Sequence, residues 1–284
     1  MLAALSQLPS ALTPRTLELS LRAANPNLIV AGVDEAGVGT IAGPLVAAAV
    51  ALPLDDDGDG ALELAAVDSK ELSPDARRAA FEQICAAPGV AFGVAAVSAR
   101  RLDALGPRPA WALAVRLACR RLERALAASA RPHYLVDGDT VPVGLDGTAV
   151  PGGDRREAAI AAASVVAASA HDEAMARLAV RHPLWALDEN GGHPSRAHLA
   201  RIAECGPSAC HRASCFPFRR RQGARYAYHP DRRAAGRIQE LLAAAARGDA
   251  PGSDAERERH ERFREMAAKQ VASAAGEGRR RRRR

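Results

Sequence analysis

The sequence predicts an α/β domain in which strands alternate with helices. Short apolar runs rich in β-branched residues, at 28–33 and 45–52, are typical of buried strands. Longer alanine-rich or amphipathic stretches, at 109–128 and 156–181, have the composition and apolar spacing of helices. The two kinds of segment interleave along the chain, an order typical of a sheet covered by helices.

The first two predicted strands form a hairpin-like start to this sheet. The run 28–33 is followed at once by Asp34-Glu35 and then by the turn Gly37-Val38-Gly39. We therefore expect a buried strand that ends in two carboxylates. The second strand spans 45–52, and the polar stretch 55–60 after it is predicted to be a solvated loop.

The remaining elements follow from capping signals and apolar periodicity. A Ser-Pro-Asp sequence at Ser73 predicts a helix N-terminus, because Ser is a favoured N-cap and Pro is favoured at the first helical position. Residues 134–136 form a short apolar run that ends in Asp137, as the first strand ends in Asp34. The predicted helices are 73–86, 109–128, 156–181 and 195–205, and the further strands are 89–97 and 134–136.

Length, composition and charge indicate one domain with extensions. The chain has 284 residues, 48% of them hydrophobic, which is enough for one sizeable core. We predict an N-terminal extension at 1–27, a domain at 28–218 and a flexible or partly helical Arg-rich tail at 219–284. The tail holds 19 basic and 9 acidic residues, a net charge of +10, which leaves −4 of the chain's +6 for the rest. Its composition predicts two exposed helices and mobility.

Cysteine usage and hydropathy favour a cytoplasmic protein. The chain has five cysteines, an odd number, and no secretory signal, which indicates reduced thiols. It lacks a long uncharged apolar run, so a membrane span is not predicted. A targeting peptide is a weaker alternative for the first 29 residues. A zinc site is another alternative, and it would use Cys205, Cys210, Cys215 and His211. It is weak, because the gaps between the cysteines do not match the spacing of paired zinc ligands.

Acidic residues at the ends of apolar runs are the pattern that points to chemistry. A sheet would bring Asp34, Glu35 and Asp137 together at one edge, and burying like charges is costly unless something neutralises them. A pair of divalent cations would do so, and it could activate water and stabilise the leaving oxygen of a phosphodiester. Carboxylates are hard oxygen ligands suited to Mg²⁺ or Mn²⁺.

These motifs, taken in order, resemble the ribonuclease HII family over roughly residues 28–218. The agreement in order and spacing is more specific than any one motif. The matching segments are Gly32 to Gly39, Ala42-Gly43-Pro44, Asp68 to Ser73, Leu135 to Gly138, Gly153-Asp154, Ala162-Ala163-Ser164, and His211-Arg212 with Ser214.

The resemblance implies an RNase H-like fold, a mixed sheet flanked by helices, and a site with four metal-binding carboxylates. By motif these are Asp34, Glu35, Asp137 and Asp154, and they would hold two Mn²⁺ or Mg²⁺ ions. The implied activity is hydrolysis of the RNA strand of RNA–DNA hybrids and of ribonucleotides embedded in duplex DNA. Cleavage on the 5′ side of the ribonucleotide would leave 3′-hydroxyl and 5′-phosphate ends. Adjacent strand residues point to opposite faces, so Asp34 and Glu35 could share this site only where the strand is ending.

The same resemblance implies substrate contacts around the carboxylates. The glycine turn would sense the ribose 2′-hydroxyl, because glycine allows close approach of the backbone. Lys70, the only lysine of the domain, would contact a phosphate, and His193 lies where the family has a sugar-stacking tyrosine. The predicted contacts are Gly37, Val38, Gly39, Lys70, His193, His211 and Arg212.

Several positions that are basic in the family are not basic here. Val38 and His171 stand in place of Arg, and Gly152 and Ala168 in place of Lys. One alternative is therefore a weakly active nucleic-acid-binding protein of this ancestry, and another is a different metal nuclease or phosphotransferase on the same fold. We hypothesise that the basic tail replaces lost phosphate contacts by nonspecific, salt-sensitive binding. A monomer is expected, because no uncharged apolar stripe is left over.

Overall fold

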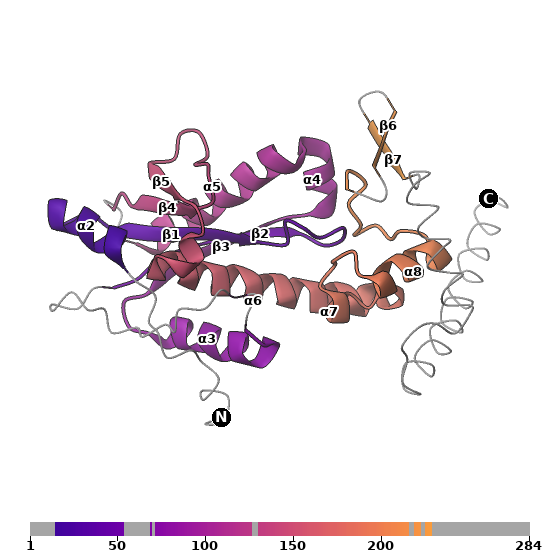
Figure 1. The fold of residues 1–284 in the computed structure, drawn as a ribbon, viewed down its shortest axis with the longest axis horizontal. Helices are drawn as coiled ribbons and strands as arrows, with labels where there is room; N and C mark the ends of the chain where they lie inside the picture. The colour runs from indigo at the N-terminus through magenta and orange to yellow at the C-terminus, as the bar shows by residue number, and fades with distance from the viewer. Residues whose placement is uncertain are drawn as a thin grey trace. The chain divides into compact units, whose positions relative to one another are not determined.

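A five-stranded mixed sheet forms the centre of the first of two compact units in the computed structural model (Figure 1). The structure describes residues 15–53, 69, 72–126, 130–215, 219–222 and 225–228. The first unit holds the described residues up to Gly39 and from Gly43 to Ala174. The second holds Thr40–Ala42 and the described residues from Met175 onward.

The sheet has the strand order β3-β2-β1-β4-β5. Its strands are β1 Val30–Ala36, β2 Leu45–Ala51, β3 Ala91–Val97, β4 His133–Asp137 and β5 Gly147–Val150. The pairs β1/β2 and β2/β3 are antiparallel, whereas β1/β4 and β4/β5 are parallel. This confirms the expected mixed sheet and the hairpin-like start. Strand β5 was not predicted, because its four residues are too few to show the apolar pattern of a strand.

Helices cover both faces of the sheet (Figure 1). Helix α5, Pro107–Ala125, packs on the face that carries alternate β1 residues such as Val33. Helices α3, Pro74–Ala86, and α6, Ala158–Arg181, pack on the opposite face. Period-two alternation along the strands therefore decides which helix each strand side chain meets.

Caps fix where several of these helices begin. Ser73 Oγ accepts from Ala76 N at 3.2 Å, which confirms the predicted start of α3. Ser98 caps the short helix α4, Ala99–Leu105, in the same way. Helix α4 was not predicted as an element separate from α5.

Helix α2, Thr16–Ala24, lies within the stretch predicted as an N-terminal extension. Its Leu17 and Leu21 pack against a core cluster of the first unit, beside Leu135 and Ile160. The segment 16–24 is thus an ordered helix of that unit. Only two of its nine residues pack against this cluster, so the apolar periodicity of the segment is weak.

The second unit contains the end of α6, the short helix α7, Leu187–Asn190, and helix α8, Arg196–Cys205. These elements bury a cluster that includes Ile41, Trp185 and Ile202. Two four-residue strands, β6 Arg219–Gln222 and β7 Arg225–Tyr228, pair antiparallel. They were not predicted within the tail.

Several predictions lie outside the described residues: the loop at 55–60, Lys70, and the exposed helices and mobility expected beyond residue 228. Among the described residues, no helix is both long enough and apolar enough to span a membrane.

Candidate active site

Strands β1 and β4 bring two acidic residues to the same edge of the sheet. Their parallel pairing ends at Val33 opposite Val136, so Asp34 and Asp137 are the next residues on the two strands. On its other side β1 stays paired with β2 as far as Ala36. Strand β1 therefore ends one residue after Glu35, and its pairing with β4 ends just before Asp34.

Asp34 is a buried carboxyl group in an acidic environment. Its side chain is 5% exposed, and its Oδ1 accepts from Glu35 N at 2.7 Å. Burial raises the pKa of Asp34 to about 8, with further contributions from the negative charges of Glu35 and Asp137. A hydrogen bond with Ser164 opposes this rise only in part. Such a group favours either a proton or a cation.

Two serines extend this contact to another predicted motif. Ser164 lies on α6, and its Oγ is 2.8 Å from Ser69 Oγ. Both serines are buried, at 3% exposure each. The bond links Asp34, through Ser164, to the Asp-Ser-Lys segment that begins at Asp68. Both serines lie within the matched motifs but were not predicted as site residues. The available signal for Ser164 was a polar residue inside an alanine-rich helix.

Glu35 points to the face of β1 opposite that of Asp34. Its Oε2 accepts from Trp111 Nε1 on α5 at 3.0 Å, whereas Asp34 bonds to Ser164 on α6. The two helices cover opposite faces of the sheet. Trp111 was not predicted as a site residue, since nothing in the sequence places α5 beside Glu35.

Asp137 and Asp154 belong to segments joined by a backbone hydrogen bond. Gly153 N donates to Asp137 Oδ1 at 2.7 Å, and Asp154 follows in the short 3₁₀ helix η1, Gly153–Arg155. Asp154 is 6% exposed. Gly152, at the N-cap of η1, has φ +63°, a left-handed conformation that favours glycine.

The carboxylates suit a divalent cation by their chemistry. In the described part of the chain, however, no three His, Cys, Asp or Glu side chains lie close enough together to form a preformed metal site. Burial and the neighbouring Glu35 and Asp137 disfavour the negative charge of Asp34, and a hard cation would compensate for it.

The glycine turn after these carboxylates requires glycine at its first position. Gly37 has φ +82°, and a Cβ there would lie 2.6 Å from Nε2 of His171, a buried residue of α6. No heavy atom within 4 Å opposes a side chain at Gly39. Val38 between them is 59% exposed. The turn thus presents its backbone and an apolar side chain outward.

Three predicted contact residues belong to the second unit. His193 is exposed, and its carbonyl oxygen is 2.8 Å from His198 Nδ1. His211 and Arg212 are each 1% exposed. Arg212 Nη1 donates to the carbonyl of Thr40 at 3.0 Å. Both side chains are therefore packed inside their own unit.

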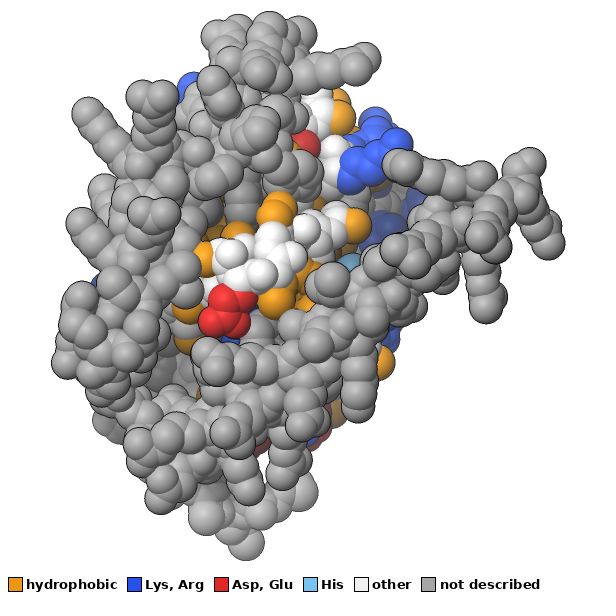
Figure 2. Space-filling model, turned by 90° about the vertical axis from the view of Figure 1, so that its right-hand side faces the viewer, with side chains coloured by type: hydrophobic (Ala, Val, Ile, Leu, Met, Phe, Trp, Pro, Cys, Tyr) orange, Lys and Arg blue, Asp and Glu red, His pale blue; other side chains and the backbone are white. Residues whose placement is uncertain are grey.

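The remaining sequence predictions concern cysteine ligands and surface charge. Cys205, Cys210 and Cys215 are free thiols, and the described residues form no cluster with His211 that could hold zinc. On the face drawn in Figure 2, the visible described side chains include basic groups gathered at one side.

This sheet topology, with acidic residues at the end of its parallel pair, defines an RNase H-like α/β fold. Two solved structures share it. The ribonuclease HII of the PCNA:RNase HII complex from Archaeoglobus fulgidus is 25% identical, with a TM-score of 0.51 over 68% of this chain and 98% of that one. The ribonuclease H2 of Pyrococcus horikoshii has the same TM-score at 21% identity, over 75% of this chain and 99% of its own.

The sequence comparisons narrow this class to one family. Residues 31–216 match the family model described as ribonuclease HII. The ribonuclease HII of Granulibacter bethesdensis is 42% identical over 189 residues, which span 66% of this chain and 83% of that protein. That of Brucella ovis is 40% identical over 196 residues, 68% of this chain and 84% of its own.

The chain belongs to the ribonuclease HII family. Its activity is that of an endoribonuclease acting on RNA–DNA hybrids, EC 3.1.26.4. The family depends on divalent metal ions.

Proposed function

We propose that the chain cleaves both RNA–DNA hybrids and single ribonucleotides embedded in duplex DNA, through two divalent cations held by Asp34, Glu35, Asp137 and Asp154. The observation that carries this proposal is the environment of Asp34. A carboxyl group with its pKa raised to about 8 by burial and by Glu35 and Asp137 is arranged for cation binding. Cleavage would leave 3′-hydroxyl and 5′-phosphate ends.

The chain's own groups would divide the work around the phosphodiester. When bound, Mn²⁺ or Mg²⁺ supplies Lewis acidity and lowers the pKa of water. Ser164 orients the Asp34 carboxylate, and Gly153 N orients that of Asp137. Trp111 holds Glu35 toward α5 until its carboxylate turns to the site. Asp154 lies directly after Gly153 and completes the set.

Substrate recognition would begin at the glycine turn. Gly37 and Gly39 leave the backbone accessible for contact with a ribose hydroxyl, with Val38 at the surface between them. Lys70 would contact a phosphate and His193 a sugar. His211 and Arg212, which are buried, would act by holding the segment Thr40–Ala42 that follows the turn: Arg212 N donates to Ile41 O at 2.8 Å.

The Arg-rich tail would anchor nucleic acid nonspecifically. Its charge of +10 favours phosphate contacts that release counterions. A chain truncated after Phe218 is expected to bind a hybrid duplex more weakly and with a smaller salt slope. Unchanged affinity and slope would contradict this role.

We also propose that the chain works as a monomer in the cytoplasm. Its five thiols are free, which suits a reducing compartment. The large hydrophobic side chains exposed in the described residues are scattered over separate elements; they are Leu19, Val38, Leu105, Val143 and Val180. Light scattering of the purified chain tests the oligomeric state, and a dimer mass would contradict it.

One cleavage assay tests the catalytic proposal. The purified chain, with Mn²⁺ and then with Mg²⁺, is incubated with a labelled DNA duplex that carries one ribonucleotide and with a full hybrid duplex. Cleavage of both, with 3′-hydroxyl products, supports the proposal. Cleavage of the hybrid alone would mean that single-ribonucleotide recognition was lost with Val38 and His193. Full activity after Asp34→Asn substitution would refute the carboxylate site.

A further inference from the structure

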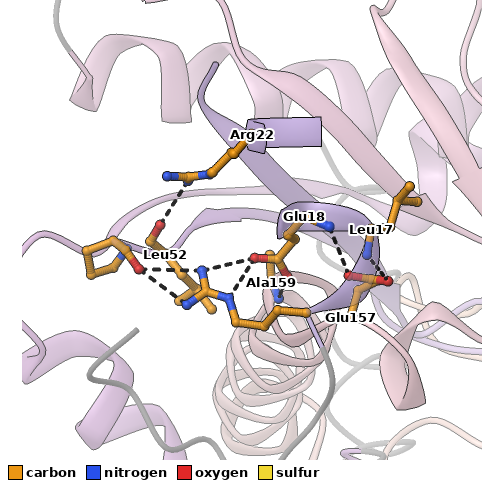
Figure 3. A network of polar contacts seen from close by, with 8 residues as sticks. Leu17, Glu18, Arg22, Leu52, Glu157 and Ala159 are labelled. Carbon is orange, nitrogen blue, oxygen red and sulfur yellow. Dashed lines mark hydrogen bonds and ion pairs between the residues drawn. The ribbon is translucent and has the colours of Figure 1, made fainter. Parts of the chain in front are cut away.

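A reciprocal pair of carboxylates joins helix α2 to the start of helix α6 (Figure 3). Glu157 Oε1 accepts from Leu17 N at 3.0 Å, and its Oε2 accepts from Glu18 N at 3.3 Å. Glu18 Oε1 in turn accepts from Ala159 N at 2.8 Å. Each glutamate therefore satisfies backbone N–H groups in the first turn of the other helix, where such donors lack partners within their own helix.

Two arginines of α2 and its N-cap balance the charge of this pair. Glu18 is fully buried and Glu157 is 4% exposed, and buried carboxylates are costly without compensation. Arg15 Nη2 lies 3.0 Å from Glu18 Oε2 and reaches the carbonyl of Pro53. Arg22 Nη2 donates to the carbonyl of Leu52 at 3.3 Å (Figure 3). The arginines thus also attach α2 to the end of β2.

The capped turn of α6 is continuous with the segment that carries Asp154. Glu157 N donates to Gly153 O at 2.8 Å, and Gly153 N donates to Asp137 Oδ1 at 2.7 Å. Asp154 lies between these two anchored positions, in η1. A shift of Glu157 would therefore be transmitted to Asp154 through three peptide units and one hydrogen bond.

The same turn packs directly on strand β1. A Cβ at Gly32 would lie 2.0 Å from the backbone carbonyl carbon of Ala159, so the two backbones are in close contact. Gly32 is two residues before Asp34 and on the same face of the strand. Glu18 thus caps the residue of α6 that sets the distance between the helix and the strand carrying Asp34.

We propose that Glu18 and Glu157 are positioning residues of the catalytic site, which hold the first turn of α6 so that Asp154 can bind metal beside Asp34 and Asp137. This inference rests on the proposed function, because it takes Asp154 to be a metal ligand. It makes α2 a working part of the catalytic unit, although neither glutamate touches the substrate or the metal.

Substitution by glutamine separates capping from simple bulk. In Glu157→Gln an NH₂ donor replaces one of the two acceptor oxygens and would face the N–H of Leu17 or Glu18, donor against donor. In Glu18→Gln the oxygen can still accept from Ala159 N, but the ion pair with Arg15 is lost. We expect a larger effect from Glu157→Gln, with Glu18→Gln carrying the test if the first variant does not fold.

The experiment is calorimetric titration of Mn²⁺ into the full-length chain, with thermal unfolding measured on the same samples. The matched control is Ser98→Ala, which removes a helix cap from α4. We expect the Mn²⁺ dissociation constant to rise about tenfold in Glu157→Gln, as is typical when a residue that supports a metal ligand is lost. Ser98→Ala should lower Tm with no change in metal affinity.

Asp154→Asn, titrated in parallel, distinguishes the two levels of the proposal. Weak binding in Asp154→Asn together with wild-type affinity in both glutamine variants would overturn the positioning role alone. Wild-type affinity in Asp154→Asn, or no binding by the wild-type chain, would overturn the proposed metal site and this inference with it. A metal affinity that falls in Ser98→Ala as much as in Glu157→Gln would also overturn the inference, because general destabilisation would then explain it.

Discussion

Trp111 Nε1 donates to Glu35 Oε2 at 3.0 Å, and this bond holds the second acidic residue of β1 on the face away from Asp34. A carboxylate must give up such a bond before it can turn to a metal ion, at a cost of about 1.5–3 kcal/mol. Trp111 therefore connects helix α5 to the candidate metal site, whereas Ser164 connects helix α6 to it.

Trp111→Phe is expected to lower the Mn²⁺ concentration needed for half-maximal hybrid cleavage by about tenfold, because Glu35 can then turn to the metal site without first losing a hydrogen bond. Phenylalanine keeps most of the ring packing but has no N–H to hold Glu35 toward α5. The matched control is Trp185→Phe, which removes an indole donation to Gly206 O in the second unit. Cleavage assays over a range of Mn²⁺ measure the effect, and equal shifts in the two variants would count against a role in the site.

Asp34→Asn is expected to abolish hybrid cleavage while stabilising the metal-free protein. In the folded chain, burial and the charges of Glu35 and Asp137 raise the pKa of Asp34 to about 8. Between about pH 4 and pH 8 the unfolded chain loses a proton that the folded chain keeps, so wild-type stability falls as pH rises through this window. Asparagine does not ionise and so avoids this loss of stability. We expect the free energy of unfolding of the variant at pH 7 to exceed that of the wild type by on the order of 2–4 kcal/mol.

Thermal unfolding in EDTA at several pH values measures this gain. The difference in Tm between Asp34→Asn and wild type should widen from pH 5 to pH 8. Glu82→Gln, which changes an exposed carboxylate on α3, serves as the control and should follow the wild type. A variant less stable than wild type at pH 8 would contradict the repulsion between these carboxylates.

Much of the fold was predictable because its signals are local. The apolar run of β2 and the Ser73 cap of α3 specify their elements without reference to the rest of the chain. Strand β5 and helix α2 were not predicted, because what orders them is distant. Residues of β5 pair with β4, and α2 is held by Glu157, about 140 positions further along the sequence.

For the candidate site, too, some features were predictable from the sequence and others were not. Motif order predicts Asp34, Glu35, Asp137 and Asp154 as metal ligands, and strand geometry brings Asp34 and Asp137 to one sheet edge. Sequence alone could not show that Glu35 faces α5, since that depends on β1 continuing to Ala36. Nor could it show the burial of His211 and Arg212, because charged and polar residues in a loop are usually exposed.

Val38→Arg is expected to strengthen binding of a hybrid duplex at low salt. The side chain of Val38 is 59% exposed in the glycine turn, so an arginine there can reach a phosphate without disturbing the core. One added phosphate contact should steepen the slope of log K against log salt by about 1. Fluorescence anisotropy in EDTA, which prevents cleavage, gives both quantities.

The control for this gain is Val143→Arg, at a position 91% exposed in the same unit. It adds the same charge at a residue outside the turn. If both variants bind more tightly by the same factor, the effect is one of net charge, and the turn is not a substrate contact.

A buried histidine pair in the second unit predicts acid sensitivity. Ser208 N donates to His211 Nδ1 at 2.9 Å, and His198 Nδ1 donates to the carbonyl of His193 at 2.8 Å. These partners leave one proton for the 3.1 Å contact between the two Nε2 atoms, which His211 donates. Both rings are therefore neutral. Burial, and then the neighbouring His198, lowers the pKa of His211 to about 3.

Because the folded pKa of His211 lies below its ordinary value of 6.5, the unfolded chain binds the extra proton between about pH 6.5 and pH 3. Stability is thus fully present above pH 6.5 and is lost as pH falls, by up to about 1.4 kcal/mol per pH unit.

In Trp111→Phe protein, fluorescence of Trp185, whose ring lies 5.8 Å from that of His211, reports unfolding of this unit. His211→Asn, which keeps an acceptor for Ser208 N, should flatten the dependence on pH, whereas substitution of the exposed His193 by Asn should not. An unchanged slope in His211→Asn would show that another group causes the acid sensitivity.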